Sequence, residues 1–387
     1  MGVNLDPVFS RVTGTYCRPL PFEGASDTAS ETASEPYQIR INGGESERCR
    51  GQALALLRLP GLRDSVQQHS IGTSSGPPSE GEWPVPAGLT SDKPCFQVCG
   101  GGHLDRHLWL QSAPVMGRTN AARQTVSTGG VAANIACHLA RTGGEVNFVG
   151  VQPPQEAPLM AARLALSGVT AEILPLDGEV PGYSAVMTPD GELLVGAAAM
   201  SLYDDVESAM IMPHLDPTTA LVIDANFPSR LLMALVRSGT ADRPQFAAGT
   251  AVGKVTRLAP CLSDLHALVL NRAEAVCLAG RRDVAVDAPV DVLAQDLVSG
   301  LANGGVVLVS DGGAEAALAN RQEVVVLSPP PLQVVNANGA GDAMAASLFW
   351  SLVTDPGMTL ATRLHSALAA GADFAAGPPH PDQAEPL

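Results

Sequence analysis

The sequence predicts an α/β protein with a doubly wound, mainly parallel sheet, helices on both faces and a small β lid. Two observations lead to this fold class. From Pro94 onward, short runs rich in β-branched residues alternate with longer segments rich in Ala and Leu. This alternation is typical of βαβ units, whose crossover helices bury both faces of a parallel sheet. One pair of strand-like runs interrupts the alternation and predicts a separate hairpin.

The main sheet is expected from short apolar runs that alternate with helical segments. Strands are predicted at Phe96–Val98, Val146–Val149, Leu221–Asp224, Leu268–Leu270 and Val306–Ser310. Helices are predicted at Val131–Arg141, Leu159–Leu166, Ser229–Arg237, Ala273–Leu278 and Val290–Leu301. Because parallel neighbours need crossover connections, these elements predict a sheet that is covered on both sides.

The interrupting segment reads as an antiparallel hairpin. The runs Tyr183–Met187 and Leu193–Ala197 are joined by five residues that contain Asp190-Gly191, a dipeptide that favours a tight turn. A hairpin between βαβ units is a candidate lid over a ligand site, so a lid is expected at about 183–197. The alternative is an ordinary surface hairpin.

Composition excludes several classes of protein. Of the 387 residues, 45% are hydrophobic and 16% charged, which excludes a wholly disordered chain. No apolar run reaches the roughly 18 residues of a membrane span, so no membrane partner is expected. The net charge of −16 argues against nucleic acid as a partner. Seven scattered cysteines and an N-terminus without a secretion signal predict reduced thiols and a cytoplasmic location.

Residues 1–92 differ from the domain expected at 93–387. Gly24–Pro36 and Gly72–Gly88 are rich in Ser, Thr, Gly, Pro and acidic residues, a composition that buries too little apolar area to fold. Between them, Gln52–Leu62 is long enough for only one short helix. We therefore expect a disordered arm. A docking peptide, a remnant of an upstream domain and an over-extended reading frame are the alternatives.

The strongest chemical signal lies in Val334–Trp350. A strand end leads through Gly339-Ala340-Gly341 into an Ala-rich helix, whose first backbone N–H groups can bind an anion. Asp342 stands in the first turn, where the helix field favours its ionised form. A carboxylate beside bound phosphate suits phosphoryl transfer, because it can accept the proton of an attacking hydroxyl. The alternative is ordinary capping chemistry.

Two further segments suit a ligand rich in hydroxyl groups. Gly129 and Gly130 precede a helix that carries Asn134 in its first turn, so a ligand could approach the backbone beside an amide side chain. Asp105 follows a run of glycines after the first strand and could hold two sugar hydroxyls. The alternative is that the glycines and Asp105 serve turns and that Asn134 serves the start of the helix.

Together these motifs resemble the ribokinase-type (PfkB) family of sugar and nucleoside kinases. The resemblance runs from about Phe96 to Ala376. It includes both signatures of the family in order: Gly129-Gly130 with Asn134, and the segment Asn336–Asp342. It implies a ribokinase-like fold and an ATP-dependent enzyme that phosphorylates an alcohol group. ATP and Mg²⁺ are the implied cofactors, a monovalent cation is a further candidate, and pairing of lids would make a homodimer.

Carried over position by position, the resemblance assigns roles to the matching residues of this chain. It makes Asp342 the catalytic base and Gly339, Ala340 and Gly341 the anion hole. It makes Asp105, Gly129, Gly130 and Asn134 the substrate contacts. It places the nucleotide at Ser310, Asp311, Gly312, Gly313 and Asn338, and it places magnesium, through water, near Asn271 and Glu274.

Within the family, the chain looks most similar to pseudouridine kinases, on the segments Met200–Asp204, Asp224–Asn226 and Lys254–Ala275. The implied reaction converts pseudouridine to pseudouridine 5′-phosphate. Ribose, an ordinary nucleoside and a ketohexose are alternative acceptors. The chain departs from the family pattern at 152–155 and 247–252. These departures favour a second alternative, a catalytically weak relative that binds a nucleoside or nucleotide and acts through partners.

Overall fold

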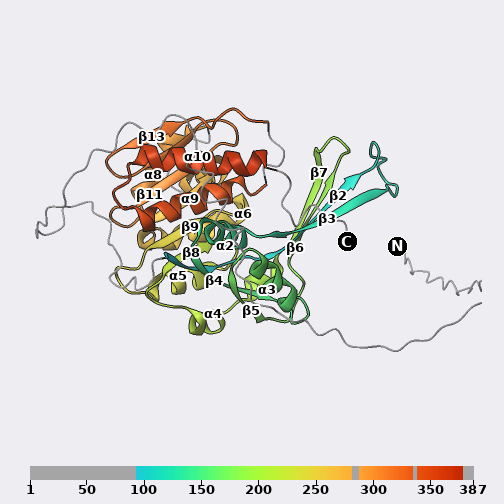
Figure 1. The fold of residues 1–387 in the computed structure, drawn as a ribbon, viewed down its shortest axis with the longest axis horizontal. Coiled ribbons are helices and arrows are strands. Elements are labelled where there is room, and N and C mark those ends of the chain that lie inside the picture. Colours follow the sequence, from blue (N-terminus) through green and yellow to red (C-terminus); the bar gives the residue numbers. More distant parts are fainter. Residues whose placement is uncertain (1–92, 281–286, 334–337, 378–387) are drawn as a thin grey trace, which may run out of the picture. The chain divides into compact units, whose positions relative to one another are not determined.

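The computed structural model describes residues 93–280, 287–333 and 338–377, all within one unit that spans 76–387. Figure 1 traces the chain through these residues. The expected N-terminal arm 1–92, with its short helix at 52–62, lies outside the described residues. The boundary between arm and domain therefore stays a prediction.

The main sheet has nine strands in the order β13-β12-β11-β10-β9-β8-β1-β4-β5. Every pair from β11 to β5 is parallel, whereas β12 and β13 run antiparallel at one edge. The predicted fold class is therefore confirmed, and all five predicted strands are present. The strands are β1 (Cys95–Cys99), β4 (Glu145–Gln152), β5 (Thr170–Pro175), β8 (Ala220–Asp224), β9 (Gln245–Ala248), β10 (Ala267–Asn271), β11 (Val306–Ser310), β12 (Ala316–Ala319) and β13 (Val324–Leu327).

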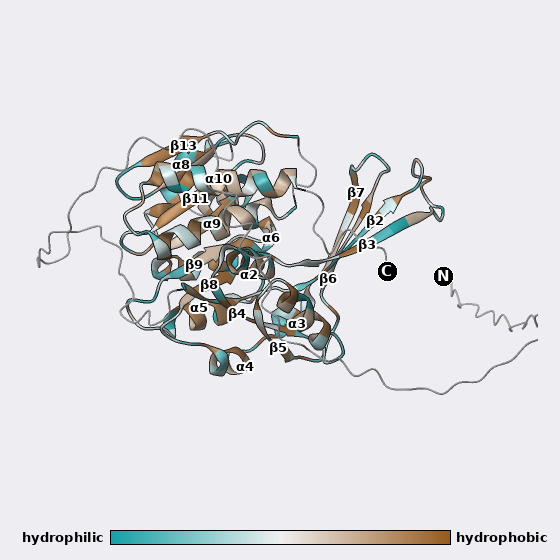
Figure 2. Cartoon of the chain, in the orientation of Figure 1, coloured by the Kyte–Doolittle hydropathy of each residue, from teal (hydrophilic) through white to brown (hydrophobic). Residues whose placement is uncertain are grey.

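Helices cover both faces of this sheet and bury two apolar layers (Figures 1 and 2). One layer contains α2, α3, α9 and α10, and the other contains α5, α7 and α8. Strands such as β8 and β11 are apolar along their length because both of their faces are covered. The helices are α2 (Val131–Thr142), α3 (Ala157–Leu166), α4 (Ser208–Ile211), α5 (Ser229–Arg237), α6 (Val252–Val255), α7 (Arg272–Ala279), α8 (Val290–Val298), α9 (Ala340–Thr354) and α10 (Leu360–Ala376). Short 3-10 turns are η2 (Ser201–Asp205), η3 (Met212–His214) and η4 (Thr256–Asp264).

The predicted helix at 290–301 is shorter than expected. It ends at Val298, because Ser299 and Gly300 follow and both favour the end of a helix. In the described part of the chain, no helix combines the length and the hydropathy needed to cross a membrane.

A second sheet of four strands has the order β3-β2-β6-β7. The predicted hairpin forms its β6 (Gly182–Met187) and β7 (Leu193–Ala199), which pair antiparallel. Strands β2 (His103–Leu110) and β3 (Ala122–Gly129) were not predicted from the sequence. Asp105 consequently lies within a strand, so the interpretation that it ends a turn was wrong.

Candidate active site

The candidate site lies where the parallel strands of the main sheet end. Gly100 follows β1, Asp224 ends β8, Gly249 follows β9, Asn271 ends β10 and Ser310 ends β11. These strands are neighbours, so their carboxyl ends form one edge of the sheet. In open α/β sheets this edge is where ligands bind. Two of the sequence-predicted site residues, Asn271 and Ser310, stand at these strand ends.

The start of α9 brings together two residues that lie 208 positions apart in the chain. Gly339 precedes the helix with a φ of 96°, a left-handed conformation that glycine adopts without strain. Ala340 and Gly341 form the first two helical positions, and Asp342 the third. Asn134 Nδ2, in the first turn of α2, donates a hydrogen bond of 2.8 Å to Asp342 Oδ2. The predicted base and one predicted substrate contact therefore lie side by side.

The carboxyl group of Asp342 has an unusual proton affinity. Burial raises its pKa from 3.8 to about 7, while the hydrogen bond from Asn134 opposes the rise. The nearby carboxylates Asp224, Glu274 and Asp105 raise it further. The expectation that the helix start keeps Asp342 ionised was incomplete, because desolvation outweighs the helix field here. A pKa near neutrality is the value at which a carboxylate works well as a general base.

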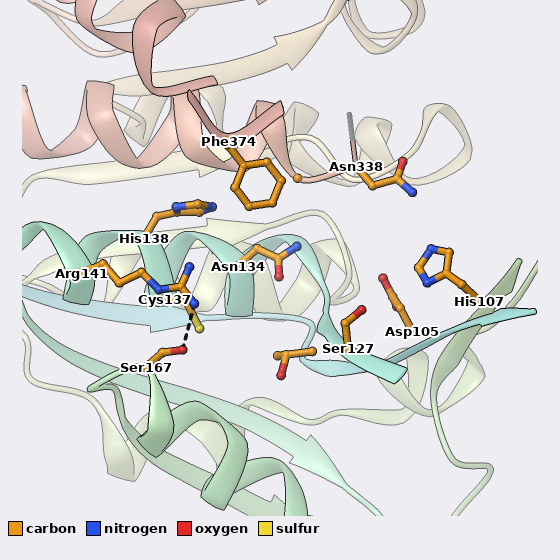
Figure 3. Close-up of a pocket in the computed structure, with 12 residues that line it drawn as sticks. Asp105, His107, Ser127, Asn134, Cys137, His138, Arg141, Ser167, Asn338 and Phe374 are labelled. Carbon is orange, nitrogen blue, oxygen red and sulfur yellow. Dashed lines mark hydrogen bonds between the residues drawn. The ribbon is translucent and has the colours of Figure 1, made fainter. Parts of the chain in front are cut away.

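A cavity of about 100 Å³ opens beside Asn134 and Gly339, and Asn134 is the lining residue that donates to Asp342 (Figure 3). Its walls come from β2, β3, α2, the start of α9 and the end of α10. Two buried atoms here make no hydrogen bond, Asp105 Oδ1 and Thr128 Oγ1, and Asp105 Oδ1 lies 3.4 Å from His103 Nε2. An unsatisfied buried acceptor is costly, so these atoms suit contact with a hydroxyl-rich ligand. The lining residues are Asp105, His107, Ser127, Thr128, Asn134, Cys137, His138, Arg141, Ser167, Asn338, Gly339 and Phe374.

The glycine pair between β3 and α2 is required by the protein's own packing. A side chain at Gly129 would overlap the carboxylate of Asp105. Gly130 has a φ of 96°, and a side chain there would overlap the carbonyl oxygen of Gly101. The glycines therefore set the position of Asp105 and the start of α2. Their direct contact with a ligand stays a prediction.

Asp224 holds these loops in place, a role that the sequence argument missed. It is fully buried, and its Oδ2 accepts hydrogen bonds from the backbone N–H groups of Gly101 and Ala132, each 3.1 Å long. Asn226 donates from its backbone to Oδ1 (2.9 Å) and from its side chain to Oδ2 (2.8 Å). The carboxylate thus ties the loop after β1 to the first turn of α2. An acid at the end of an otherwise apolar strand was the available signal.

The predicted magnesium-side pair is also brought together. Asn271 Oδ1 accepts from the backbone N–H of Glu274 at 2.9 Å, and Glu274 Oε2 accepts from that of Asn271 at 3.0 Å. This reciprocal capping starts α7. Burial raises the pKa of Glu274, whose carboxylate lies against the backbone of Gly249. No three His, Cys, Asp or Glu residues within the described ranges are grouped closely enough to hold a metal ion.

The predicted nucleotide segment forms a turn after β11. Ala314 N donates to Asp311 O at 2.9 Å, and Gly312 has a φ of 56°. Asp311 Oδ2 lies 3.9 Å from Arg272 Nε, and Gly313 leaves open space around its backbone. This turn lies at the opposite end of the edge from β1. Asn338, predicted for the same ligand, instead lines the cavity together with Asn134 and Gly339.

The nine-stranded α/β sheet with a second, smaller sheet, together with a helix start that carries a buried carboxyl group, is typical of a class of α/β kinases. The chain belongs to the family described as pfkB family carbohydrate kinase, whose model matches residues 110–375. The family resemblance predicted from the motifs is therefore confirmed. The protein is a phosphotransferase of the sugar and nucleoside kinase type, with an alcohol group as acceptor and ATP as donor.

Three comparisons illustrate the relationship. The chain is 26% identical over 281 residues to 1-phosphofructokinase from Rhodobacter capsulatus, covering 69% of this chain and 85% of the relative. It is 25% identical over 270 residues to pseudouridine kinase from Escherichia coli (strain K12), covering 66% and 83%. A carbohydrate kinase from Agrobacterium tumefaciens superposes with a TM-score of 0.61 at 27% identity, over 72% of this chain and 90% of that one.

Proposed function

We propose that this kinase transfers the γ-phosphoryl group of ATP to a primary hydroxyl of a nucleoside or sugar, with pseudouridine as the favoured acceptor. The observation that carries the proposal is the pairing of Asp342 with Asn134 at the start of α9. Asn134 lines the cavity together with Asp105, whose Oδ1 makes no hydrogen bond and lies 3.4 Å from His103 Nε2. These groups suit a hydroxyl acceptor that lies between a base and a phosphate-binding helix start.

In the proposed reaction, Asp342 accepts the proton of the acceptor hydroxyl while the hydroxyl oxygen bonds to the γ-phosphorus. The bond from that phosphorus to the bridging oxygen breaks, and ADP leaves. Asn134 orients Asp342 through its hydrogen bond. The backbone N–H groups at Gly339–Gly341 stabilise the charge on the phosphoryl oxygens. Asp105 holds other hydroxyls of the acceptor, so that the reacting one faces the base.

The turn at Ser310–Gly313 and Asn338 are proposed as nucleotide contacts. Mg²⁺ prefers oxygen ligands, and the carboxylate of Glu274 beside the amide of Asn271 provides oxygens of the right kind. When bound, the ion would neutralise phosphate charge. These two residues would hold it with help from water and phosphate oxygens. The need for a monovalent cation stays a prediction.

Acceptor identity separates the candidate reactions. We expect purified protein with ATP and Mg²⁺ to release ADP fastest with pseudouridine in a panel that includes uridine, adenosine, ribose, fructose and fructose 1-phosphate. Asp342→Asn serves as the control for background ATP hydrolysis. Turnover on another member of the panel would keep the kinase and replace pseudouridine. A folded protein that binds ATP but phosphorylates nothing would favour the binding relative instead.

The lid supports a homodimer. β7 is an edge strand whose Leu193, Leu194 and Val195 are 55%, 43% and 57% exposed, and it is apolar along its length (Figure 2). Such an edge tends to pair with another strand. We expect light scattering to give twice the chain mass and Val195→Lys to give a monomer. Leu166→Lys, at an exposed leucine on α3, is the control. A monomeric wild type would exclude the lid dimer.

A further inference from the structure

Lys254 occupies the middle of the sheet edge. It follows β9, whose neighbours are β8 and β10. Its Nζ donates a hydrogen bond of 2.8 Å to Asn226 Oδ1 and lies 5.7 Å from the centre of the Tyr203 ring. Asn226 in turn donates to Asp224. The lysine is half-buried, and these contacts hold its ammonium group in one place while using one of its three N–H donors.

Thr250 provides a second, independent observation. Its Oγ1 is buried and has no hydrogen-bond partner. Thr250 follows Gly249, whose backbone lies against the carboxylate of Glu274. A buried hydroxyl usually finds a partner in the protein, so an orphan at a ligand-binding edge indicates a partner that comes with the ligand.

The place of these two residues along the edge identifies the group that they would meet. The acceptor cavity adjoins the start of α2 and the second sheet, and the proposed nucleotide turn follows β11. The phosphoryl group must pass between the two, where β8, β9 and β10 end. An ammonium group and a hydroxyl are both suitable partners for phosphate oxygens.

The charge balance of the edge also favours this role. Asp342 lies close enough to the carboxylates of Asp224, Glu274 and Asp105 for their charges to raise its pKa. A triphosphate that enters this acidic region needs a cation. Arg257 is already held by the carbonyl of Asn226 and by Asp204, at 2.6 and 2.7 Å. Lys254, by contrast, keeps donors to spare.

We infer that Lys254 and Thr250 bind the phosphoryl group in transfer: the ammonium and the hydroxyl donate to its non-bridging oxygens. This inference rests on the proposed function. The proton of the acceptor hydroxyl goes to Asp342, so Lys254 takes no part in the proton transfer. The lysine thus neutralises charge that grows as the bond to ADP breaks.

The test compares ligands with and without the γ-phosphate. Lys254→Met is expected to weaken binding of the non-hydrolysable ATP analogue AMP-PNP by about 10-fold or more, and of ADP by less than about twofold. It should also lower kcat by roughly 100-fold. Thr250→Val should also weaken AMP-PNP binding more than ADP binding, but by a smaller factor. Lys254→Arg should bind AMP-PNP more tightly than Lys254→Met does. Calorimetry with Mg²⁺ present measures all of these affinities.

The controls distinguish failure of this inference from failure of the proposed kinase function. Arg230→Met removes an exposed cation from the same region and should change neither affinity. Equal losses for ADP and AMP-PNP, or a change confined to the acceptor KM, would overturn the inference while wild-type turnover upholds the proposed function. A wild type that neither binds nor uses ATP would overturn both. If Lys254→Met fails to fold, Thr250→Val and Lys254→Arg still decide the question.

Discussion

Asp342→Asn is expected to lower kcat by roughly 10²–10⁴-fold, the usual contribution of a positioned general base. The amide keeps the size of the side chain and can still accept the hydrogen bond from Asn134, but it cannot take up a proton. Affinity for ADP should stay within about twofold of the wild type. ADP release and calorimetry provide the two measurements. A variant that keeps a tenth of the wild-type rate would show that another group accepts the proton.

The proton affinity of Asp342 predicts a distinctive pH profile. Burial raises the pKa of Asp342 to about 7, so the carboxylate form disappears below that pH. The wild-type kcat/KM should therefore fall by about tenfold per pH unit below pH 7 and level off above it. A profile that stays flat down to pH 5 would contradict this role of the raised pKa.

The same raised pKa has the opposite consequence for stability. The folded-state pKa lies above the ordinary value of 3.8, so the stabilising bound proton is fully present below about pH 4 and lost as the pH rises through 7. Each pKa unit corresponds to about 1.4 kcal/mol. Ionising Asp342 in the folded protein therefore lowers the free energy of unfolding by at most about 4 kcal/mol. Asp342→Asn should therefore have a higher Tm than the wild type at pH 8 and an equal Tm at pH 4. If the Tm difference between Asp342→Asn and the wild type were the same at pH 8 and pH 4, the raised pKa would not be destabilising the fold.

Five of the nine strands of the main sheet could be predicted, because each contains a short run that is mostly apolar. Strand β11 is an example: both of its faces are covered, so its residues 306–309 are all apolar. Strand β2 could not be predicted in this way. Its sequence HLDRHLWL carries charged residues on a partly exposed surface and begins directly after three glycines, so it resembled a loop. The lid hairpin was found because Asp190-Gly191 marks its turn.

The residues of the site also fall into those that local motifs identify and those that only the fold reveals. Asp342 and Asn134 stand in local motifs, so pattern and resemblance identified both before the fold placed them in contact. Asp224, Lys254 and Thr250 stand in no local motif that shows what they do. Their importance depends on partners in other elements, such as the backbone of Ala132 for Asp224. Only the folded chain shows which buried donors are satisfied and which are not.

Asp224→Ala is expected to have the largest effect on stability. It leaves the backbone N–H groups of Gly101, Ala132 and Asn226 and the Asn226 amide without their buried acceptor. Each buried donor that loses its acceptor costs about 1–3 kcal/mol, so a total of roughly 3 kcal/mol or more is expected. Chemical denaturation measures this cost. Asp205→Ala, at an exposed aspartate, is the control and should change stability by less than about 0.5 kcal/mol. An equal cost at both positions would contradict the anchoring role.

Asp224→Asn separates anchoring from charge. It keeps the shape of the side chain and one of its two acceptor oxygens, which can still accept at the Oδ2 position, so it should cost only about 1–3 kcal/mol and fold. It also removes a negative charge that raises the pKa of Asp342. The acid limb of the kcat/KM profile should therefore move to lower pH, although Asp224 contacts neither substrate in the proposed reaction. Glu274→Gln removes another such charge without loosening the anchor at Ala132. If the fall of kcat/KM at acid pH shifts in Glu274→Gln but not in Asp224→Asn, Asp224 anchors the loops without affecting the pKa of Asp342.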